Sequence, residues 1–405
     1  MALTLAERVK ACLGGMYIGD ALAMPVHWYY DVRQLKRDFG RITQYEVPKP
    51  TFPGSIMNLS NTGGGGRGSD KGNVVGDVIL HGKRKYWLKG GSYHYHHGMR
   101  KGQNTLDCWW RASSCAASLS RVITRRVFVM LRAMRSIAQS RHAMMLRTAA
   151  DCLVARALMC SIAQSGGAFD EDAFRGAYVR LMTTPGAHDD AYAGTCHRMF
   201  FAKWARGVDP RECPDNDGHN VDAIDVLSAA AAAAAAGDAA PAAAAAAAAA
   251  REALSVQLAR MIRVTRSSAV LPRFADNYAR MLLAVLGGGD LRAAVQDAGA
   301  ELGVDVPAMV RSNEDPMTAC YITRAYPALL HYAYKYAEDP EAALLASTNA
   351  GGENVARGCL LGALLGAAHG LRAFPQRFVR DLDDADALYG EIDAFVAAVQ
   401  QQCAL

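Results

Sequence analysis

Two acidic residues that lie far apart in the sequence, Asp20 and Glu353, are the first candidates for chemistry. Asp20 closes the segment GGMYIGD, and Glu353 follows the glycine turn in NAGGE. Acidic residues often do no more than cap a turn or a helix start. Carboxylates that meet in a buried place instead indicate a functional polar site. These two segments leave both interpretations open, and the choice depends on the helices that carry the acids.

A glycine-rich loop is the second candidate. The stretch 48–102 is rich in Gly and Ser, and an irregular segment this long inside a compact protein is more often functional than idle. Its GGGGRGS run could surround an anion with backbone N–H groups and a guanidinium. The candidate anion contacts are Gly64, Gly65, Gly66, Arg67 and Ser69. The same glycines could equally form a flexible tip.

Three histidines in YHYHHG are the third candidate. His94 and His96 alternate with other residues, and His97 follows. Alternate residues on an extended segment share a face, which suits a transition metal. No Cys or carboxylate stands nearby at ligand spacing, so the default interpretation is surface or hydrogen-bonded histidines.

The helices that must position the two acids have an unusual small-residue pattern. Gly358, Gly362 and Gly366 recur every four residues in the segment after Glu353. Since Gly costs about 1 kcal/mol relative to Ala in a helix interior, three on one face indicate close approach of another helix. The first helix repeats the spacing with Gly15 and Gly19, directly before Asp20. The sequence therefore predicts that these two helices pack together and bring their acids to one place.

Helical patterns dominate the rest of the chain. Because almost no alternating strand pattern occurs, an all-α fold is predicted. Asp189 and Asp190 are placed in the first turn of a helix within 185–207, where carboxylates suit the helix dipole. The other predicted helices are an N-terminal one that ends near Pro25, 31–39, 169–184, 251–264, 271–286, 291–302, 315–337 with an interruption at Pro327, and 384–401.

Two segments have biased composition. Residues 108–151 contain eight Arg, and Asp107–Cys108 recurs as Asp151–Cys152. Without this segment, TLD would join CLVARALMCSIAQSGG in one amphipathic helix. We therefore interpret 108–151 as an insertion, either a helical excursion that binds an acidic partner or translated noncoding sequence. The alanine tracts in 229–250 are interpreted as an expanded helix or a helical spacer without chemistry.

Composition excludes several classes of protein. With 405 residues and 51% hydrophobic content, the chain can bury a large core. The net charge of +5 comes from the arginines of 108–151, which argues against a nucleic-acid-binding surface elsewhere. Ten Cys without a CxxC pair or a secretory leader predict a reduced, cytoplasmic protein. The longest apolar run, 229–250, is alanine interrupted by Gly, Asp and Pro, so no membrane span is predicted.

Four blocks of the chain resemble successive blocks of the ADP-ribosylglycohydrolase superfamily, which includes the J-type crystallins. They are GGMYIGDALAMPVHW, HHGMRKGQNTLD, MTTPGAHDDAYAGTCHRMFFAKWARG and NAGGENVARGCLLGALLGAAHG, in the family's order. The resemblance covers most of the chain outside 108–151 and the alanine tracts. It implies a single large orthogonal helical bundle over residues 1–405 with a cleft for ADP-ribose and Mg²⁺. Enzymes of this family hydrolyse the bond between ADP-ribose and a protein side chain.

The resemblance also identifies departures in the metal motifs. The family's Glu after Gly-Asp corresponds to His27, and a family His corresponds to Arg266. The triplet Thr-Asp-Asp becomes Thr105, Leu106 and Asp107, and the late Asp-x-Asp-Thr becomes ENVA from Glu353 onward. What remains implies Mg²⁺ ligands at Thr105, Asp107 and Glu353, with Asp20 and His27 as further donors. These donors suffice for one ion completed by water, whereas a two-ion site is undersupplied.

Two classes of function follow. The first is a Mg²⁺-assisted hydrolase of an ADP-ribosylated protein side chain or small molecule, in which Asp107 and Glu353 hold the ion or activate water. Its predicted substrate contacts are Gly64, Gly65, Gly66, Arg67, Ser69, His188, Asp190, Asn349, Gly351 and Gly352. The second is an inactive ADP-ribose or nucleotide binder, or a structural protein like the J-crystallins. Acids on both the early and the late helix favour the hydrolase. The group attached to ADP-ribose and the oligomeric state stay open.

Overall fold

The structure, a computed structural model, describes residues 2–55, 57, 74–87, 92–105, 158–159, 161–162, 169–236, 244–311 and 314–403. Within these ranges the regular elements are helices, and β-structure is limited to isolated bridges such as Ala223 with Tyr321. The predicted all-α fold is confirmed. None of the helices in these ranges is both long and apolar enough to cross a lipid bilayer.

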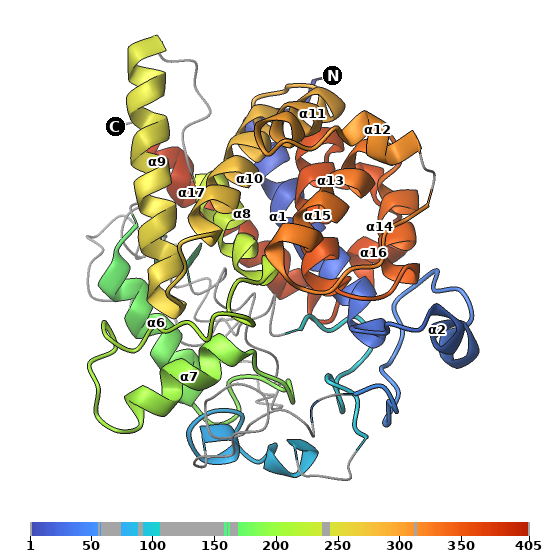
Figure 1. Ribbon diagram of the computed structural model, residues 1–405. Coiled ribbons are helices and arrows are strands. Elements are labelled where there is room, and N and C mark those ends of the chain that lie inside the picture. The colour runs from blue at the N-terminus through green and yellow to red at the C-terminus, as the bar shows by residue number, and fades with distance from the viewer. Residues whose placement is uncertain are drawn as a thin grey trace, which may run out of the picture.

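Two glycine-faced helices, α1 (Leu5–Ala23) and α15 (Val355–His369), lie side by side at the centre of the fold (Figure 1). A Cβ atom on Gly362 would lie 2.0 Å from the carbonyl oxygen of Gly15, and one on Gly19 would lie 2.0 Å from that of Gly358. Only residues without a Cβ permit this backbone contact. The pairing order makes the helices antiparallel, so the end of α1 meets the start of α15. The predicted close packing is confirmed.

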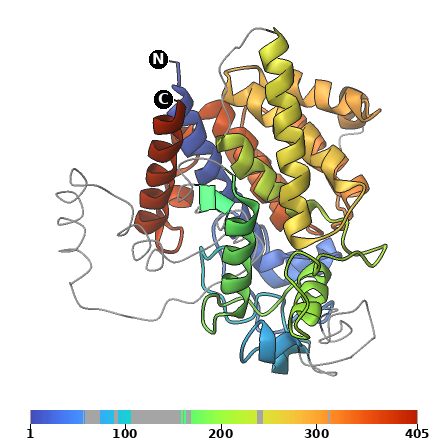
Figure 2. The same cartoon turned by 90° about the vertical axis from the view of Figure 1, so that its left-hand side faces the viewer.

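Further helices surround this central pair. On the far side from the view of Figure 1, α17 (Ala385–Cys403) packs along α1 (Figure 2), where Lys10 Nζ lies 2.6 Å from Asp393 Oδ1. The helices of the bundle are α8 (Leu227–Ala236), α10 (Leu271–Leu286), α11 (Leu291–Glu301), α12 (Val306–Arg311), α13 (Ile322–Lys335), α14 (Pro340–Asn349) and α17 (Ala385–Cys403). The sequence did not predict α12, α14 or the short α16 (Gln376–Arg380).

The first alanine tract is a core helix. Ala229 to Ala235 are all buried in α8, which packs against α10, α15 and α1. Alanine gives such a helix no polar face, and its small side chains allow neighbours to approach on every side. The spacer interpretation is therefore wrong for 229–236. The second tract enters α9 (Ala244–Thr265), and the segment between them is outside the described residues.

The remaining elements form a second layer below the bundle in Figure 1. They include α6 (Glu171–Thr183) and α7 (Thr195–Trp204), which begins at the N-cap Gly194. Asp189 and Asp190 precede α7, so their predicted place in a first helical turn is wrong. The chain from Thr184 to Gly194 instead runs as turns and extended backbone. The other elements here are η1 (Met24–Val26), α2 (Val32–Phe39), η3 (Val74–Val78), η4 (Arg84–Trp87) and η5 (Ile224–Val226), while η6 (Leu371–Ala373) follows α15.

The predicted helix 315–337 is shorter than expected. It begins at Ile322, since residues 314–320 form irregular backbone and Tyr321 forms an isolated bridge with Ala223. Asp315 folds back onto the helix. The carboxylate of Asp315 accepts hydrogen bonds from Lys335 Nζ and the Tyr336 hydroxyl, each at 2.8 Å. This leaves Cys320 and Tyr321 outside α13, where they form part of a cavity wall.

Candidate functional site

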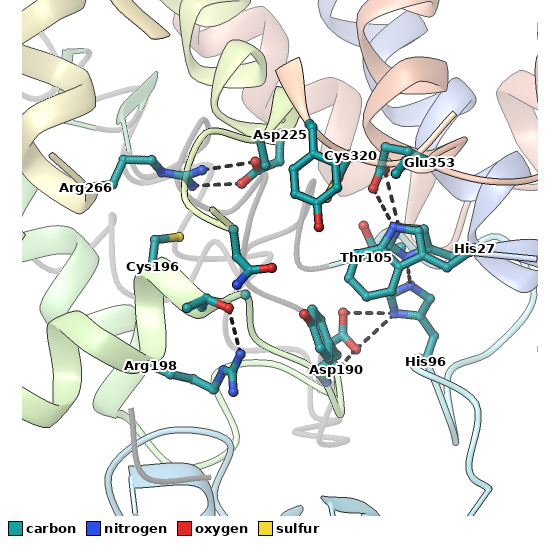
Figure 3. Close-up of a pocket in the computed structure, with 18 of the residues that line it drawn as sticks. His27, His96, Thr105, Asp190, Cys196, Arg198, Asp225, Arg266, Cys320 and Glu353 are labelled. Atoms are coloured by element: carbon teal, nitrogen blue, oxygen red, sulfur yellow. Dashed lines mark hydrogen bonds and ion pairs between the residues drawn. The ribbon is translucent and has the colours of Figure 1, made fainter. Parts of the chain in front are cut away.

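A cavity of about 300 Å³ lies between the two layers, where the segment after α1, the loop before α15 and the start of α7 meet (Figure 3). Its walls are mostly aromatic and charged. The lining residues are His27, Trp28, Tyr30, His96, Thr105, Asp190, Tyr192, Gly194, Thr195, Cys196, Arg198, Asn220, Ala223, Asp225, Arg266, Ala319, Cys320, Tyr321 and Glu353. A concave site with convergent polar groups is the usual place for a small-molecule ligand.

Glu353 reaches this cavity because a glycine turn brings the chain back toward α1. Gly351 and Gly352 have φ angles of +72° and +65°, and a Cβ on either would collide with the carbonyl oxygens of Tyr29 or Thr318. The Glu353 side chain is 3% exposed, and its Oε2 accepts a hydrogen bond of 2.5 Å from the indole of Trp28. Its Oε1 accepts one of 3.3 Å from the backbone N–H of Ala356.

A row of buried side chains connects Glu353 with Asp190. Asp190 Oδ1 lies 3.0 Å from His96 Nδ1, His96 Nε2 lies 2.7 Å from His27 Nδ1, and His27 Nε2 lies 3.3 Å from Glu353 Oε1 (Figure 3). The two imidazole planes are nearly parallel, 5° apart. The Asp190–His96 and His96–His27 contacts are hydrogen bonds, whereas His27 Nε2 and Glu353 Oε1 lie within ion-pair distance without hydrogen-bond geometry. The row is therefore arranged to hold or pass a proton.

Burial shifts the pKa values of His27 and Glu353, which lie at one end of this row, in opposite directions. It lowers the pKa of His27, although the nearby Glu353 carboxylate opposes that change. Burial also raises the pKa of Glu353, but His27 and the Trp28 indole outweigh it and hold that pKa below its ordinary value. A neutral His27 would attract Glu353 less. The N–H groups of Trp28 and Ala356 lower the pKa of Glu353 further and do not depend on the charge of His27.

The default interpretation of the YHYHHG histidines, as surface or hydrogen-bonded residues, is therefore correct only in part. His96 is hydrogen-bonded as expected, but neither it nor His94 is a surface residue, since they are 2% and 0% exposed. His97 is half-buried, and its Nδ1 lies 2.8 Å from the Pro50 carbonyl oxygen. They lie on a turn, so they do not share the face of an extended segment. In the described ranges, no three His, Cys, Asp or Glu side chains are grouped so that they could hold a metal ion.

Asp20 supports the cavity without lining it. Its Oδ2 accepts hydrogen bonds from Asn104 Nδ2 at 2.9 Å and the Thr105 N–H at 2.8 Å, while Oδ1 accepts one from the Thr105 hydroxyl at 2.6 Å. Burial raises the pKa of Asp20 to about 8, against the effect of these donors. The predicted convergence is realised indirectly, because Asp20 fixes Thr105 and Thr105 lines the cavity with Glu353.

These contacts test whether the described residues fit a Mg²⁺ ion, which takes six oxygen ligands in a near-octahedral shell. The Thr105 hydroxyl donates to Asp20, and the oxygens of Asp20 are already engaged. One oxygen of Glu353 accepts the Trp28 indole, and the other faces His27. The oxygen atoms of the described residues therefore do not by themselves provide a ligand set for Mg²⁺. Asp107, the remaining predicted ligand and catalytic residue, is outside the described residues.

The predicted substrate contacts have mixed locations. Gly64, Gly65, Gly66, Arg67 and Ser69 are outside the described residues. Asp190 lines the cavity, whereas His188 is buried beside it and does not. Asn349 donates to and accepts from the backbone of Ile42, at 2.9 and 2.8 Å. Gly351 and Gly352 pack against the backbone of Tyr29 and Thr318, and they form the turn that positions Glu353. The structure thus gives these last three residues packing contacts away from the cavity lining.

Sequence reasoning missed three features of the cavity. Trp28 directly follows His27 in a quoted block, and its indole could have been considered as a partner for Glu353. Arg266 forms an ion pair of 2.7 Å with Asp225 in the wall, an interaction that no local pattern indicates. The start of α7, with Gly194 as N-cap and no side-chain cap, faces the cavity together with Arg198. Such a helix start is a favourable place for an anion.

Comparisons with known proteins agree with this architecture. The model of the ADP-ribosylglycohydrolase family matches residues 118–404, a range that begins inside the predicted insertion. A solved structure described as "ADP-ribosylglycohydrolase-related protein complex" is similar over 98% of this chain and 99% of its own, with a TM-score of 0.53 and 18% identity. At that identity the likeness shows the fold alone. No curated protein matches the chain.

Proposed function

The chain belongs to the ADP-ribosylglycohydrolase family, and on this premise we propose that it hydrolyses a glycosidic bond between ADP-ribose and a protein side chain or small molecule. The reaction takes place in the cavity lined by Glu353 and Asp190. The observation that carries the proposal is the row of side chains that connects these two carboxylates through His27 and His96. It combines an ionised acid with a path for a proton in one buried place.

Each end of the row has a task in such a reaction. As the bond at the ribose C1 breaks, positive charge develops on the sugar, and a carboxylate next to it stabilises that charge. Glu353 supplies this carboxylate and can also accept the proton of an attacking water. His27 can then take the proton and share it with His96, whose charge Asp190 balances. The water oxygen forms the new bond to C1 as the bond between C1 and the leaving group breaks. The leaving group keeps the electron pair of that bond and takes up the proton that His27 and His96 received from water.

The rest of the cavity suits the remaining parts of ADP-ribose. The start of α7 and Arg198 offer N–H groups and positive charge to a diphosphate. Trp28, Tyr30, Tyr192 and Tyr321 provide aromatic surfaces against which a base or a ribose can pack. Arg266 pairs with Asp225, whereas Arg198 donates to the Thr195 hydroxyl at 2.8 Å and so lies at the start of α7, where the helix N-terminus adds to its positive charge.

Magnesium stays a prediction from the family resemblance. The donors of Thr105 and Glu353 are engaged by protein groups, and no step of the proposed reaction passes through a metal. A titration with MgCl₂ and with EDTA, followed by both turnover and the unfolding temperature, tests this prediction. A rise in both with Mg²⁺ would support an ion held with the help of Asp107.

Turnover is tested on ADP-ribosylated Arg and Ser peptides, with released ADP-ribose measured by chromatography. We expect Glu353→Gln to lower kcat by about 10²- to 10⁴-fold, the usual effect of losing a positioned acid-base group. Asp190→Asn should have a smaller effect, because Asp190 acts through His96. Glu341→Gln is the matched control, since Glu341 lies on α14 and pairs with Arg377 at the surface.

Three outcomes separate the candidates. Loss of turnover in Glu353→Gln but not in Glu341→Gln supports the hydrolase. Equal turnover in Glu353→Gln and Glu341→Gln contradicts it. If no variant and no wild-type sample releases ADP-ribose, while ADP-ribose still raises the unfolding temperature in EDTA, the protein is a binder.

A further inference from the structure

Trp28 has a backbone conformation that large residues seldom adopt. Its φ angle is +59°, and only two other non-glycine residues of the described ranges, Leu80 and Asp384, have a positive φ. The left-handed region places Cβ against the carbonyl oxygen and is unfavourable for a bulky side chain. Such strain persists only where surrounding contacts impose it, and it concentrates at functional sites.

Two backbone hydrogen bonds hold Trp28 in this conformation. Its N–H donates to the Gly352 carbonyl at 3.0 Å, and the Gly352 N–H donates to the Tyr29 carbonyl at 2.8 Å. Residues 28–29 and 352 therefore form a reciprocal clamp between the segment after α1 and the turn that carries Glu353. A shift of one segment would move the other.

The indole ring is fixed as firmly as the backbone. It packs edge-on against Tyr95 and Tyr192, with ring centroids 4.7 and 5.0 Å away and interplanar angles of 82° and 81°. Edge-to-face contacts of this kind are favourable and restrict the plane of the ring. The only polar atom of the indole, Nε1, donates to Glu353 Oε2 at 2.5 Å. A donor in a fixed plane sets the plane of the carboxylate that accepts from it.

We propose that Trp28 is a positioning residue that occupies Oε2 of Glu353 and thereby presents Oε1 as the reacting oxygen. The proposal rests on the proposed hydrolase function. Oε1 is the atom that lies 3.3 Å from His27 Nε2, at the start of the proton path. Without the indole, the Ala356 N–H at 3.3 Å from Oε1 still donates to the carboxylate, but the terminal torsion is broad with no strong preference of its own, so the carboxylate plane is held less firmly. The charge would remain, but its alignment with His27 and the substrate would be less well defined.

A second tryptophan provides the matched control. Trp87 is buried where Trp28 is half-buried, and its indole also donates a hydrogen bond, of 2.7 Å, but the acceptor is the Ala191 carbonyl. Trp28→Phe and Trp87→Phe each remove one indole N–H from a buried aromatic cluster. We expect Trp28→Phe to lower kcat by about 10- to 100-fold with KM changed less than about twofold, since the lost contact acts on the reacting group. Trp87→Phe should lower the unfolding temperature without this loss of kcat.

An NMR measurement tests the contact independently of turnover. In protein with ¹⁵N-labelled tryptophan, the indole proton of Trp28 should resonate downfield of the other indole protons, because its acceptor is charged. Glu353→Gln replaces that acceptor by a neutral amide, and the Trp28 signal should move upfield while the Trp87 signal stays. Cross-peaks to the ring of Tyr95 assign the Trp28 signal, since Tyr192 packs against both Trp28 and Trp87. This arm therefore holds even if Trp28→Phe does not fold.

Each result decides between supporting and overturning the inference. An unmoved Trp28 signal in Glu353→Gln overturns the contact. Unchanged kcat in Trp28→Phe, a change in KM alone, or an equal loss of kcat in Trp87→Phe overturns the positioning role. If wild-type protein has no turnover, the proposed function fails, and the Trp28 signal alone then decides whether the indole holds Glu353.

Discussion

His188 shows at the scale of one residue how burial sets the response to acid. It is 7% exposed, and burial lowers its pKa to about 4, although Asp190 opposes this change while Lys83 and His81 add to it. Burial also lowers the pKa of His94 and of His197 well below the usual value. These rings are therefore neutral in the folded protein and become charged when the chain unfolds in mild acid.

The sign of the resulting pH dependence follows from proton linkage. The folded-state pKa of His188 is depressed, so the unfolded chain binds the extra proton between about pH 6.5 and 4. Above that window, the protonation of His188 does not reduce the free energy of unfolding. As the pH decreases through the window, that free energy falls by up to about 1.4 kcal/mol per pH unit. We expect His188→Gln to remove this pH-dependent decrease. Denaturant unfolding of both proteins at several pH values measures it.

The comparison has a built-in control. Above about pH 7 the difference in unfolding free energy between wild type and His188→Gln should be constant, because the histidine is neutral in both states. Below that, wild type should lose stability relative to the variant. A difference that does not depend on pH from 8 down to 4 would contradict a buried neutral His188.

At the scale of elements, the crossing of α1 and α15 is the most demanding contact of the fold. A Cβ on Gly362 would meet the Gly15 carbonyl at 2.0 Å, and neither backbone can move without disturbing the core. We expect Gly362→Ala to destabilise the protein by at least about 2–3 kcal/mol, since overpacking forces backbone shifts. It should also disturb the site, because α15 begins directly after Glu353. Thermal unfolding and turnover measure the two effects.

Gly390 is the matched control for this prediction. It lies inside α17, and an added Cβ would meet nothing within 4 Å. Gly390→Ala should therefore stabilise the protein by about 0.5–1 kcal/mol through helix propensity alone. Equal effects of the two alanines would show that helix propensity, and not the close crossing, governs Gly362.

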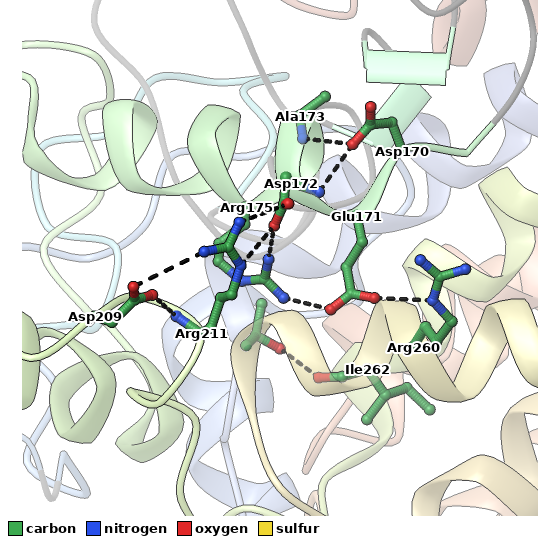
Figure 4. Close-up of polar contacts among 10 residues, drawn as sticks. Asp170, Glu171, Asp172, Ala173, Arg175, Asp209, Arg211, Arg260 and Ile262 are labelled. Atoms are coloured by element: carbon green, nitrogen blue, oxygen red, sulfur yellow. Dashed lines mark hydrogen bonds and ion pairs between the residues drawn. The ribbon is translucent and has the colours of Figure 1, made fainter.

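A network of charges holds the lower layer to the bundle side of the molecule (Figure 4). Arg175 on α6 contacts Glu171 and Asp172 of the same helix, and Glu171 Oε2 accepts from Arg260 Nε of α9 at 2.9 Å. Asp172 also binds Arg211 at 2.8 Å, in the loop after α7. A single exposed ion pair contributes little to the free energy of unfolding. A network around a buried arginine such as Arg175 restricts how the helices can shift relative to one another. It thereby restrains α6 relative to α9 and to the loop after α7.

At the scale of the whole molecule, the predicted insertion 108–151 lies outside the described residues, but both its flanks reach α1. Asn104 Nδ2 donates to the Tyr17 carbonyl at 2.6 Å, and the Tyr17 hydroxyl lies 4.0 Å from Met159 Sδ. The chain thus leaves and returns beside one residue. This arrangement fits an excursion from a closed core, although the family match begins at residue 118.

A shortened protein tests this interpretation. With Asp107 joined directly to Cys152, we expect the helical circular dichroism per residue to be kept and the unfolding transition to remain cooperative within a few degrees of wild type. Helices that fold around the α1–α15 pair do not need the segment. A broad transition, or aggregation under conditions where the full chain is soluble, would mean that 108–151 is part of the fold.

The sequence by itself determined the class of the fold and its central contact. Helical periodicity and small-residue spacing are local properties, and they indicated the all-α fold and the α1–α15 pair, whereas they left open whether Glu353 caps a turn or lies in a buried site. Motif order along the chain similarly indicated the family. Each of these inferences needs only residues within one segment, or two segments with matching patterns.

Tertiary structure alone decided how the site is connected. His27, His96, Asp190 and Glu353 come from four separate segments, and their contact depends on loops whose paths no periodicity records. The same holds for Asp190, which a dipole argument placed in a helix, and for α8, whose alanines gave no sign that every face is covered. Packing of distant segments settles these points, because a side chain's role follows from which neighbours the folded chain brings to it.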